Sequence, residues 1–187
     1  MSDNTKVAIA DAFKLLIQDK GISKINVQDI SSLAGVSRHT FYYHFRDVYS
    51  LTEWIFESEG KRLFESYDNL NNWELGLERA CSYAVENRVL VIRMYHSIFR
   101  ENFINFFQKI IYSIISRIVD SEFSNIVVTD AEKNFLLDFY TFGCAGTLCK
   151  WLDNNMEEDY HMIVDKLHTI IHGSIEDALI RFSGGKV

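Results

Sequence analysis

Residues 27–47 read VQDISSLAGVSRHTFYYHFRD and contain two short helical patterns on either side of a tight turn. Asn26 can cap the first helix, because Asp29 stands three residues later in the capping-box position. Gly35 lies in the turn, and Ser37 can cap the second helix. Two short helices joined by a turn that contains glycine are typical of a helix-turn-helix, so this stretch predicts one.

The spacing of apolar residues gives the second helix of this motif a buried face and an exposed face. Phe41 and Phe45 lie four residues apart and therefore point the same way. We expect them to pack in a small three-helix core with Ile30, Leu33 and Val36. The opposite face is then free to enter a groove of DNA.

The exposed face carries side chains that can contact bases and phosphates. Arg38 can make a bidentate contact to guanine, and His39 and Thr40 can reach base edges or a thymine methyl group. Tyrosine hydroxyls and helix N-termini can bind phosphates. The predicted DNA-binding residues are Asn26, Val27, Gln28, Ser37, Arg38, His39, Thr40, Tyr42, Tyr43 and His44. Two alternatives stay open: these aromatic residues fill a core, or the motif serves only protein contacts.

The rest of the chain also has helical spacing, which predicts an all-α protein. The sequence has 187 residues, no proline and only 9 glycines, whereas sandwiches and barrels depend on turns rich in both. It has no recognisable secretory signal, and no apolar run reaches the roughly 18 residues of a membrane span. The helices expected after the motif span residues 48–67, 73–87, 88–99, 102–121, 130–153 and 159–182.

Charge is unevenly distributed along the chain, whose net charge is −7. Residues 1–47 hold six basic and five acidic side chains, whereas residues 48–187 have a net charge of −8. Only the N-terminal part can therefore approach a polyanion without strong repulsion. Cys81, Cys144 and Cys149 form no CxxC motif, so we expect a reduced chain in the cytoplasm.

The motif resembles the DNA-binding domain of TetR-family transcriptional regulators. The shared pattern is Asp-Ile in the first helix, Ala-Gly-Val-Ser through the turn, then Thr, an aromatic pair and His-Phe. The resemblance covers roughly residues 5–67. The decapeptide at 38–47, together with residues 143–151, is similar to the subgroup typified by dihydroxyacetone-kinase regulators. One departure is Val48, where family members usually carry a lysine that can meet the DNA backbone.

This resemblance implies a division into three parts and a regulatory function. The parts are a helix-turn-helix domain over 1–47, a connecting helix over 48–67, and an effector-binding and dimerisation domain over 68–187. The implied function is that of a ligand-responsive repressor, which binds a palindromic operator of double-stranded DNA as a homodimer. The alternative is a transcriptional activator that is controlled by a protein partner instead of a small molecule.

The resemblance also implies an effector cavity and a dimer interface in the C-terminal part. Aromatic walls with a few polar groups suit a small-molecule pocket, although each such residue could equally fill a core. The effector-pocket candidates are Tyr83, Arg93, Tyr95, Phe99, Phe103, Phe107, Tyr112, Phe139 and Phe142. The dimer-interface candidates are Gly143, Gly146, Trp151, Leu167, Ile171 and Leu179, together with the small residues Ala145 and Thr147.

Signs of catalysis or of a metal site are weak. No GxSxG, HExxH or phosphate-binding glycine loop occurs, so we assign no catalytic residue and no cofactor. His161, Asp165, His168 and His172 form a polar stripe on the expected last helix, and the last two have metal-ligand spacing. Because no cysteine or second carboxylate joins them in the sequence, we expect a solvated or interface-edge face and no metal.

The connecting helix is the only covalent link between the predicted reading domain and the rest. We expect its apolar side, with Trp54, Ile55 and Phe64, to pack against the C-terminal part. Such packing would let a bound effector change the distance between the two helix-turn-helix domains of a dimer.

Overall fold

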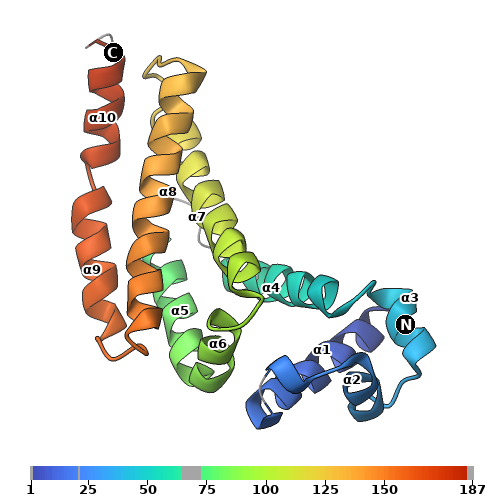
Figure 1. The fold of residues 1–187 in the computed structure, drawn as a ribbon. Helices are drawn as coiled ribbons and strands as arrows, with labels where there is room; N and C mark the ends of the chain where they lie inside the picture. The colour runs from blue at the N-terminus through green and yellow to red at the C-terminus, as the bar shows by residue number, and fades with distance from the viewer. Residues whose placement is uncertain (1, 21, 65–72, 185–187) are drawn as a thin grey trace. The chain divides into compact units, whose positions relative to one another are not determined.

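The structure, a computed structural model, describes residues 2–20, 22–64 and 73–184, and every regular element in these ranges is a helix (Figure 1). The predicted all-α fold is thus confirmed. In chain order the elements are α1 (Ser2–Lys20), the short 3-10 helix η1 (Ile22–Lys24), α2 (Val27–Leu33), α3 (Arg38–His44), α4 (Val48–Phe64), α5 (Trp73–Glu86), α6 (Arg88–Tyr95), α7 (Arg100–Glu122), α8 (Asp130–Asp153), α9 (Tyr160–Ile171) and α10 (Ser174–Phe182).

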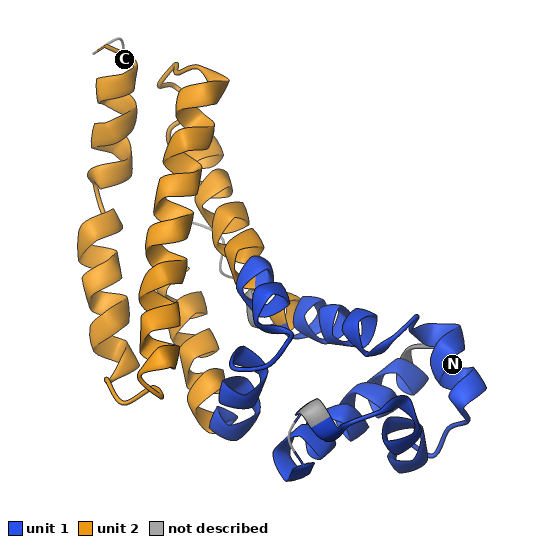
Figure 2. Cartoon of the chain, in the orientation of Figure 1, with its two compact units in different colours: residues 1–59, 87–106 blue, residues 60–86, 107–187 orange. Residues whose placement is uncertain are grey.

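The helices form two compact units, which Figure 2 colours separately. Unit 1 comprises residues 1–59 and 87–106, and unit 2 comprises residues 60–86 and 107–187. Along the chain, α4 and α7 each begin in unit 1 and end in unit 2. In this division α6 and the first turns of α7 cluster with the N-terminal helices, and the functional boundaries expected near residues 47 and 67 stay a prediction.

The core of unit 1 holds the helix-turn-helix together. Ile30 and Phe41 are both 0% exposed, and Phe45 is buried in the same cluster, as the spacing predicted. Leu33 is a correction, because its side chain is 52% exposed. The buried side of α2 runs instead through Ile30 and Ser31 to the half-buried Ala34, so Leu33 faces away from the core.

Side-chain caps fix where the helices begin. Asn26 Oδ1 accepts from Asp29 N at 3.0 Å, and the Asp29 carboxylate accepts from Asn26 N at 3.3 Å, which completes the predicted capping box. Asp47 caps α4 in a similar way, since its Oδ1 accepts from Ser50 N at 2.8 Å. At α8, Thr129 forms a capping box with its N3 glutamate.

The apolar side of α4 packs within unit 1, whose buried cluster includes Met94 and Phe99 from the predicted C-terminal part. Trp54 lies edge-on to Phe45 with ring centroids 5.9 Å apart, and Ile55 belongs to the same buried cluster. The side chain of Phe64 and residues 65–72 lie outside the described residues, and so does the end of the predicted connecting helix.

Unit 2 is built around α8, which contacts both α9 and α10 (Figure 1). The expected single helix over 159–182 is in fact two helices, because Gly173 adopts a left-handed φ of +79° between them. Tyr140 of α8 donates to Ser174 Oγ at 2.8 Å and so ties α8 to the start of α10. Helix α5 also packs against α9.

One further boundary differs from the expected helices. The helix predicted over 88–99 ends at Tyr95, because Ser97 turns the chain. The Ser97 hydroxyl donates to Met94 O at 2.6 Å and accepts from Phe99 N at 3.0 Å. The helices predicted over 102–121 and 130–153 are confirmed. Within the described ranges, no helix has the length and apolar character needed to cross a membrane.

The burial of Phe41 and the exposure of Leu33 give a test of this core. Phe41→Ala should destabilise unit 1 by about 3–5 kcal/mol, because it leaves a cavity, whereas Leu33→Ala should change its stability by less than about 1 kcal/mol. Hydrogen exchange of the α2 and α3 amides measures the local effect in the full chain. Equal acceleration of exchange in both variants would contradict this core.

Candidate nucleic-acid interface

The exposed face of α3 presents the predicted base-reading side chains. Arg38 and His39 are exposed in its first turn, and Tyr42 and Tyr43 are exposed in its second. Phe41, in contrast, is completely buried, so its position fixes the rotation of the helix about its axis. The exposed set offers one guanidinium, one imidazole and two phenol hydroxyls to a neighbouring surface.

Several other predicted DNA-binding residues use their side chains within the protein. Ser37 Oγ accepts from Thr40 N at 3.0 Å and lies 2.8 Å from Thr40 Oγ1, so both hydroxyls take part in the cap of α3. Gln28 Nε2 donates to Ser32 Oγ at 3.0 Å along its own helix. Val27 packs against the buried cluster of unit 1. Ser37 and Thr40 therefore fix the start of α3, while the contacts of Gln28 and Val27 belong to α2 and the core.

The loop between α3 and α4 carries a local ion pair. Arg46 Nε lies 3.0 Å from Asp47 Oδ2, and the arginine side chain is mostly exposed. The backbone N–H of Ser50, which donates to Asp47, lowers the pKa of that carboxyl below its usual value, and the Arg46 charge acts in the same direction. The cap of α4 therefore stays ionised and intact at neutral pH, and it weakens only as the pH falls through this lowered pKa.

The candidate pocket residues divide between the two units. Arg93, Tyr95, Phe99 and Phe103 lie in unit 1. Tyr95 is completely buried, and its hydroxyl accepts from Arg100 Nη2 at 2.6 Å. The ring of Phe103 lies 5.3 Å from that of Phe56 on α4. These aromatic residues therefore join α4, α6 and α7 in the core of unit 1.

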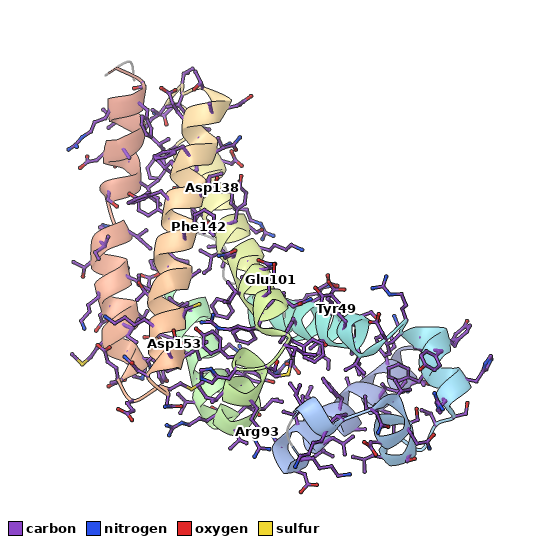
Figure 3. The ribbon with its side chains drawn as sticks, viewed as in Figure 1. Tyr49, Arg93, Glu101, Asp138, Phe142 and Asp153 are labelled. Carbon is purple, nitrogen blue, oxygen red and sulfur yellow. The ribbon has the colours of Figure 1, made fainter. Side chains whose placement is uncertain are left out.

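The remaining pocket candidates lie in unit 2, and two of them face outward. Phe139 and Phe142 are 64% and 57% exposed on α8, instead of lining the interior as expected (Figure 3). Tyr83 lies under the Arg62 guanidinium at 5.5 Å, and Phe107 is half-buried. The hydroxyl of Tyr112 donates to Asn134 Oδ1 at 3.4 Å.

The dimer-interface candidates divide into buried and exposed residues. Four candidates are buried within their own chain: Trp151, Leu167, Ile171 and Leu179. Their side chains therefore do not offer a surface to a partner, although the sequence had suggested that they would. Trp151 Nε1 donates to the backbone carbonyl of Glu158 at 2.8 Å. The small candidates Gly143, Gly146 and Thr147 are exposed on α8, whereas Ala145 is buried.

The histidine stripe keeps the solvated character expected from the sequence, because His161, Asp165 and His172 are exposed and His168 is half-buried, and its histidines also contact α5. His168 Nδ1 lies 2.7 Å from Glu74 Oε1, and His161 Nδ1 lies 3.4 Å from Glu78 Oε1. The ring of His172 stacks on that of His168 at 5.3 Å. In the part of the chain that the structure describes, no three His, Cys, Asp or Glu side chains are arranged to hold a metal ion.

The two buried cysteine thiols, Cys81 and Cys144, are not activated nucleophiles. Burial raises the pKa of Cys81 to about 12 and that of Cys144 to about 11. Both thiols are therefore protonated at neutral pH, whereas the thiolate is the reactive form.

Comparisons with known proteins agree with the fold and the motif. The family model "Bacterial regulatory proteins, tetR family" matches residues 9–51, and the model "Transcriptional regulator C-terminal region" matches residues 71–173. The chain is 28% identical over 167 residues to the HTH-type dhaKLM operon transcriptional activator DhaS of Lactococcus lactis. This match covers 87% of this chain and 88% of the relative.

Solved structures show the same fold. A TetR transcriptional regulator from Streptococcus agalactiae superposes with a TM-score of 0.62 at 25% identity, over 91% of this chain and 94% of the other. The dihydroxyacetone kinase operon activator DhaS superposes with a TM-score of 0.66 at 23% identity, over 95% and 97% of the two chains. The matched families are regulators and not enzymes. The chain belongs to the TetR family of DNA-binding transcriptional regulators.

Proposed function

We propose that this regulator binds a palindromic double-stranded DNA operator as a homodimer, in the cytoplasm, and changes its DNA affinity when an effector binds. The observation that carries the proposal is the orientation of α3. Its buried Phe41 leaves Arg38, His39, Tyr42 and Tyr43 together on the exposed face. A helix of this kind can enter the major groove, which an α-helix fits.

The exposed residues of α3 have different roles in this proposal. Arg38 reads guanine, because a guanidinium can bind the two acceptors on its major-groove edge at once. Tyr42 and Tyr43 donate to phosphates, which sets the register of the helix on the duplex. The capping side chains of Asn26 and Ser37 act indirectly, by holding the starts of α2 and α3.

The outward face of α8 supports a homodimer. Phe135, Phe139 and Phe142 are 65%, 64% and 57% exposed, and Gly143 and Gly146 follow on the same face. A Cβ atom at either glycine would meet nothing within 4 Å in its own chain. Since a glycine inside a helix costs about 1 kcal/mol relative to alanine, the absence of side chains there suits the close approach of a second copy.

The regulator can act on transcription in two directions, repression or activation. In repression, a dimer that occupies a promoter blocks transcription. An effector then releases the dimer from DNA by favouring a shape in which the spacing of its two helix-turn-helix motifs no longer matches the operator. Activation is the second, supported by the name of the Lactococcus lactis relative as an operon activator. In either case the effector is a small molecule or a protein partner that binds the C-terminal part.

The reading and anchoring roles can be separated on operators selected from random DNA. Arg38→Ala should cost roughly 1–3 kcal/mol on the selected site and relax base preference. Tyr42→Phe should weaken binding to all sequences about equally, because only a phosphate contact is lost. Tyr160→Phe, the same change on α9 in unit 2, is the control and should leave affinity unchanged.

Salt and base preference provide the outcomes that would contradict these roles. Wild-type affinity should fall by orders of magnitude between about 50 and 200 mM salt as phosphate contacts release counterions. Affinity that did not change with salt would exclude the proposed DNA complex. A change of base preference in Tyr42→Phe, without one in Arg38→Ala, would reverse the two assignments.

The α8 interface can be tested by adding charge to it. Phe139→Glu combined with Phe142→Glu should give a monomer in sedimentation, because two carboxylates would be buried against a second copy. Affinity for the palindrome should then fall about 100-fold or more, since the second half-site is no longer held by the same particle. A double variant that remains a dimer would show that another surface forms the interface.

A matched control separates the interface from a general effect of added charge. Leu75 is 54% exposed on α5, also in unit 2, so Leu75→Glu introduces a carboxylate at a similarly exposed apolar position. This variant should stay dimeric and keep its affinity for the palindrome.

The sign of regulation can be measured by transcription in vitro from a promoter that contains the selected operator. Added wild-type protein should lower transcript yield if it acts by occlusion. Protein carrying Arg38→Ala should have no effect at the same concentration, because it no longer occupies the site. A rise in yield with wild-type protein would replace repression by activation.

A further inference from the structure

Arg93 makes a polar link between α6 and the end of α1, within unit 1. Its Nη1 donates to the backbone carbonyls of Ile17 at 2.6 Å and Gln18 at 2.8 Å, although these residues are more than 70 positions away in sequence (Figure 3). The last four carbonyls of a helix have no partner within that helix. Arg93 therefore supplies donors to two of the free carbonyls of α1.

The charge on Arg93 suits this position. The C-terminal end of a helix carries a partial negative charge, so a guanidinium there is stabilised by the helix dipole as well as by the two hydrogen bonds. Hydrogen bonds from a charged donor are stronger than those between neutral groups. The sequence had suggested a role for Arg93 in binding an effector, whereas its Nη1 donates two hydrogen bonds to the end of α1.

Helix α1 is the element through which this link reaches the reading helix. Its Phe13 shares the buried cluster of unit 1 with Phe41 of α3 and with Met94 of α6. Helix α1 contacts both α2 and α6. A second charged link, between Lys14 Nζ and Glu59 Oε1 at 2.7 Å, joins α1 to α4.

We infer that Arg93 is a positioning residue for DNA reading: by capping α1 from α6, it holds the helix-turn-helix in its binding orientation without touching DNA. The inference depends on the proposed DNA-binding function and adds a residue to it. Without the Arg93 bonds, the last turn of α1 is free to fray, and the helices that pack on α1 lose a fixed support. The reading face is then correctly oriented for a smaller fraction of the time, which weakens the apparent affinity.

The test compares two arginines on the same helix. Arg93→Met removes the donors and the charge but keeps an apolar stem, while Arg88→Met removes the same charge from an exposed position at the start of α6. The selected duplex is titrated at high concentration to count binding-competent molecules, and at low concentration to obtain the dissociation constant.

We expect Arg93→Met to raise the dissociation constant about tenfold relative to Arg88→Met, the size of one lost charge-assisted hydrogen bond. The competent fraction should stay complete, and the slope of affinity against salt should stay unchanged, since no phosphate contact is lost. Arg93→Lys should recover part of the affinity, because an ammonium can still donate at the helix end.

Three outcomes would overturn the inference. An unchanged dissociation constant would show that the cap does not affect reading. A reduced competent fraction with an unchanged constant would show a role in folding alone. A salt slope lower by about one would show that Arg93 itself touches a phosphate.

Hydrogen exchange of the free protein keeps this inference separate from the proposed function. Arg93→Met should speed exchange in the last turn of α1 and in α2 and α3, and Arg88→Met should not. If wild-type protein binds no duplex, the proposed function fails. Hydrogen exchange in α1, α2 and α3 still decides whether Arg93 stabilises the helix-turn-helix. Unchanged exchange in Arg93→Met would overturn the cap.

Discussion

The burial of Phe41 is the contact on which the proposed DNA-reading surface depends. A helix as short as α3 is not stable by itself in water, so its existence and its rotation come from tertiary packing. The cap at Ser37 sets where the helix begins, and the buried ring sets which side faces outward. With both fixed, Arg38, Tyr42 and Tyr43 have only one side of the helix to occupy.

Local signals in the sequence predicted the helix starts and the exposed face of α3 correctly. The capping boxes at Asn26 and Thr129 depend on residues three positions apart, so a single sequence contains all the information they need. Glycines were harder to interpret. Gly143 and Gly146 stay helical within α8, whereas Gly173 is left-handed and separates α9 from α10. The residue type is the same in each case, and only the surrounding packing selects the conformation.

The partner of an apolar face could not be predicted, because helical spacing shows which residues share a side but not what covers it. Trp54 was expected to pack against the C-terminal part, yet its ring lies edge-on to Phe45 of the helix-turn-helix. Tyr95 was expected to line a ligand cavity, yet its side chain is completely buried. The sequence of α8 does contain a signal of a second buried face, because this helix is apolar on more than one side. Phe139 lies on the side of α8 opposite the buried Leu137 and Leu148. Apolar residues all round a helix indicate burial on every side. The Arg93 contact left no local signal, because its acceptors are backbone atoms of a distant segment.

The position of Trp54 gives the molecule a built-in optical probe. The chain has three tryptophans, and Trp54 is in unit 1 while Trp73 and Trp151 are in unit 2. Its indole touches the ring of Phe45 and has the Lys6 ammonium 5.9 Å from its centre, so its emission depends on the state of the helix-turn-helix core. Replacing the other two tryptophans by phenylalanine would leave a protein whose tryptophan fluorescence reports on the helix-turn-helix core alone.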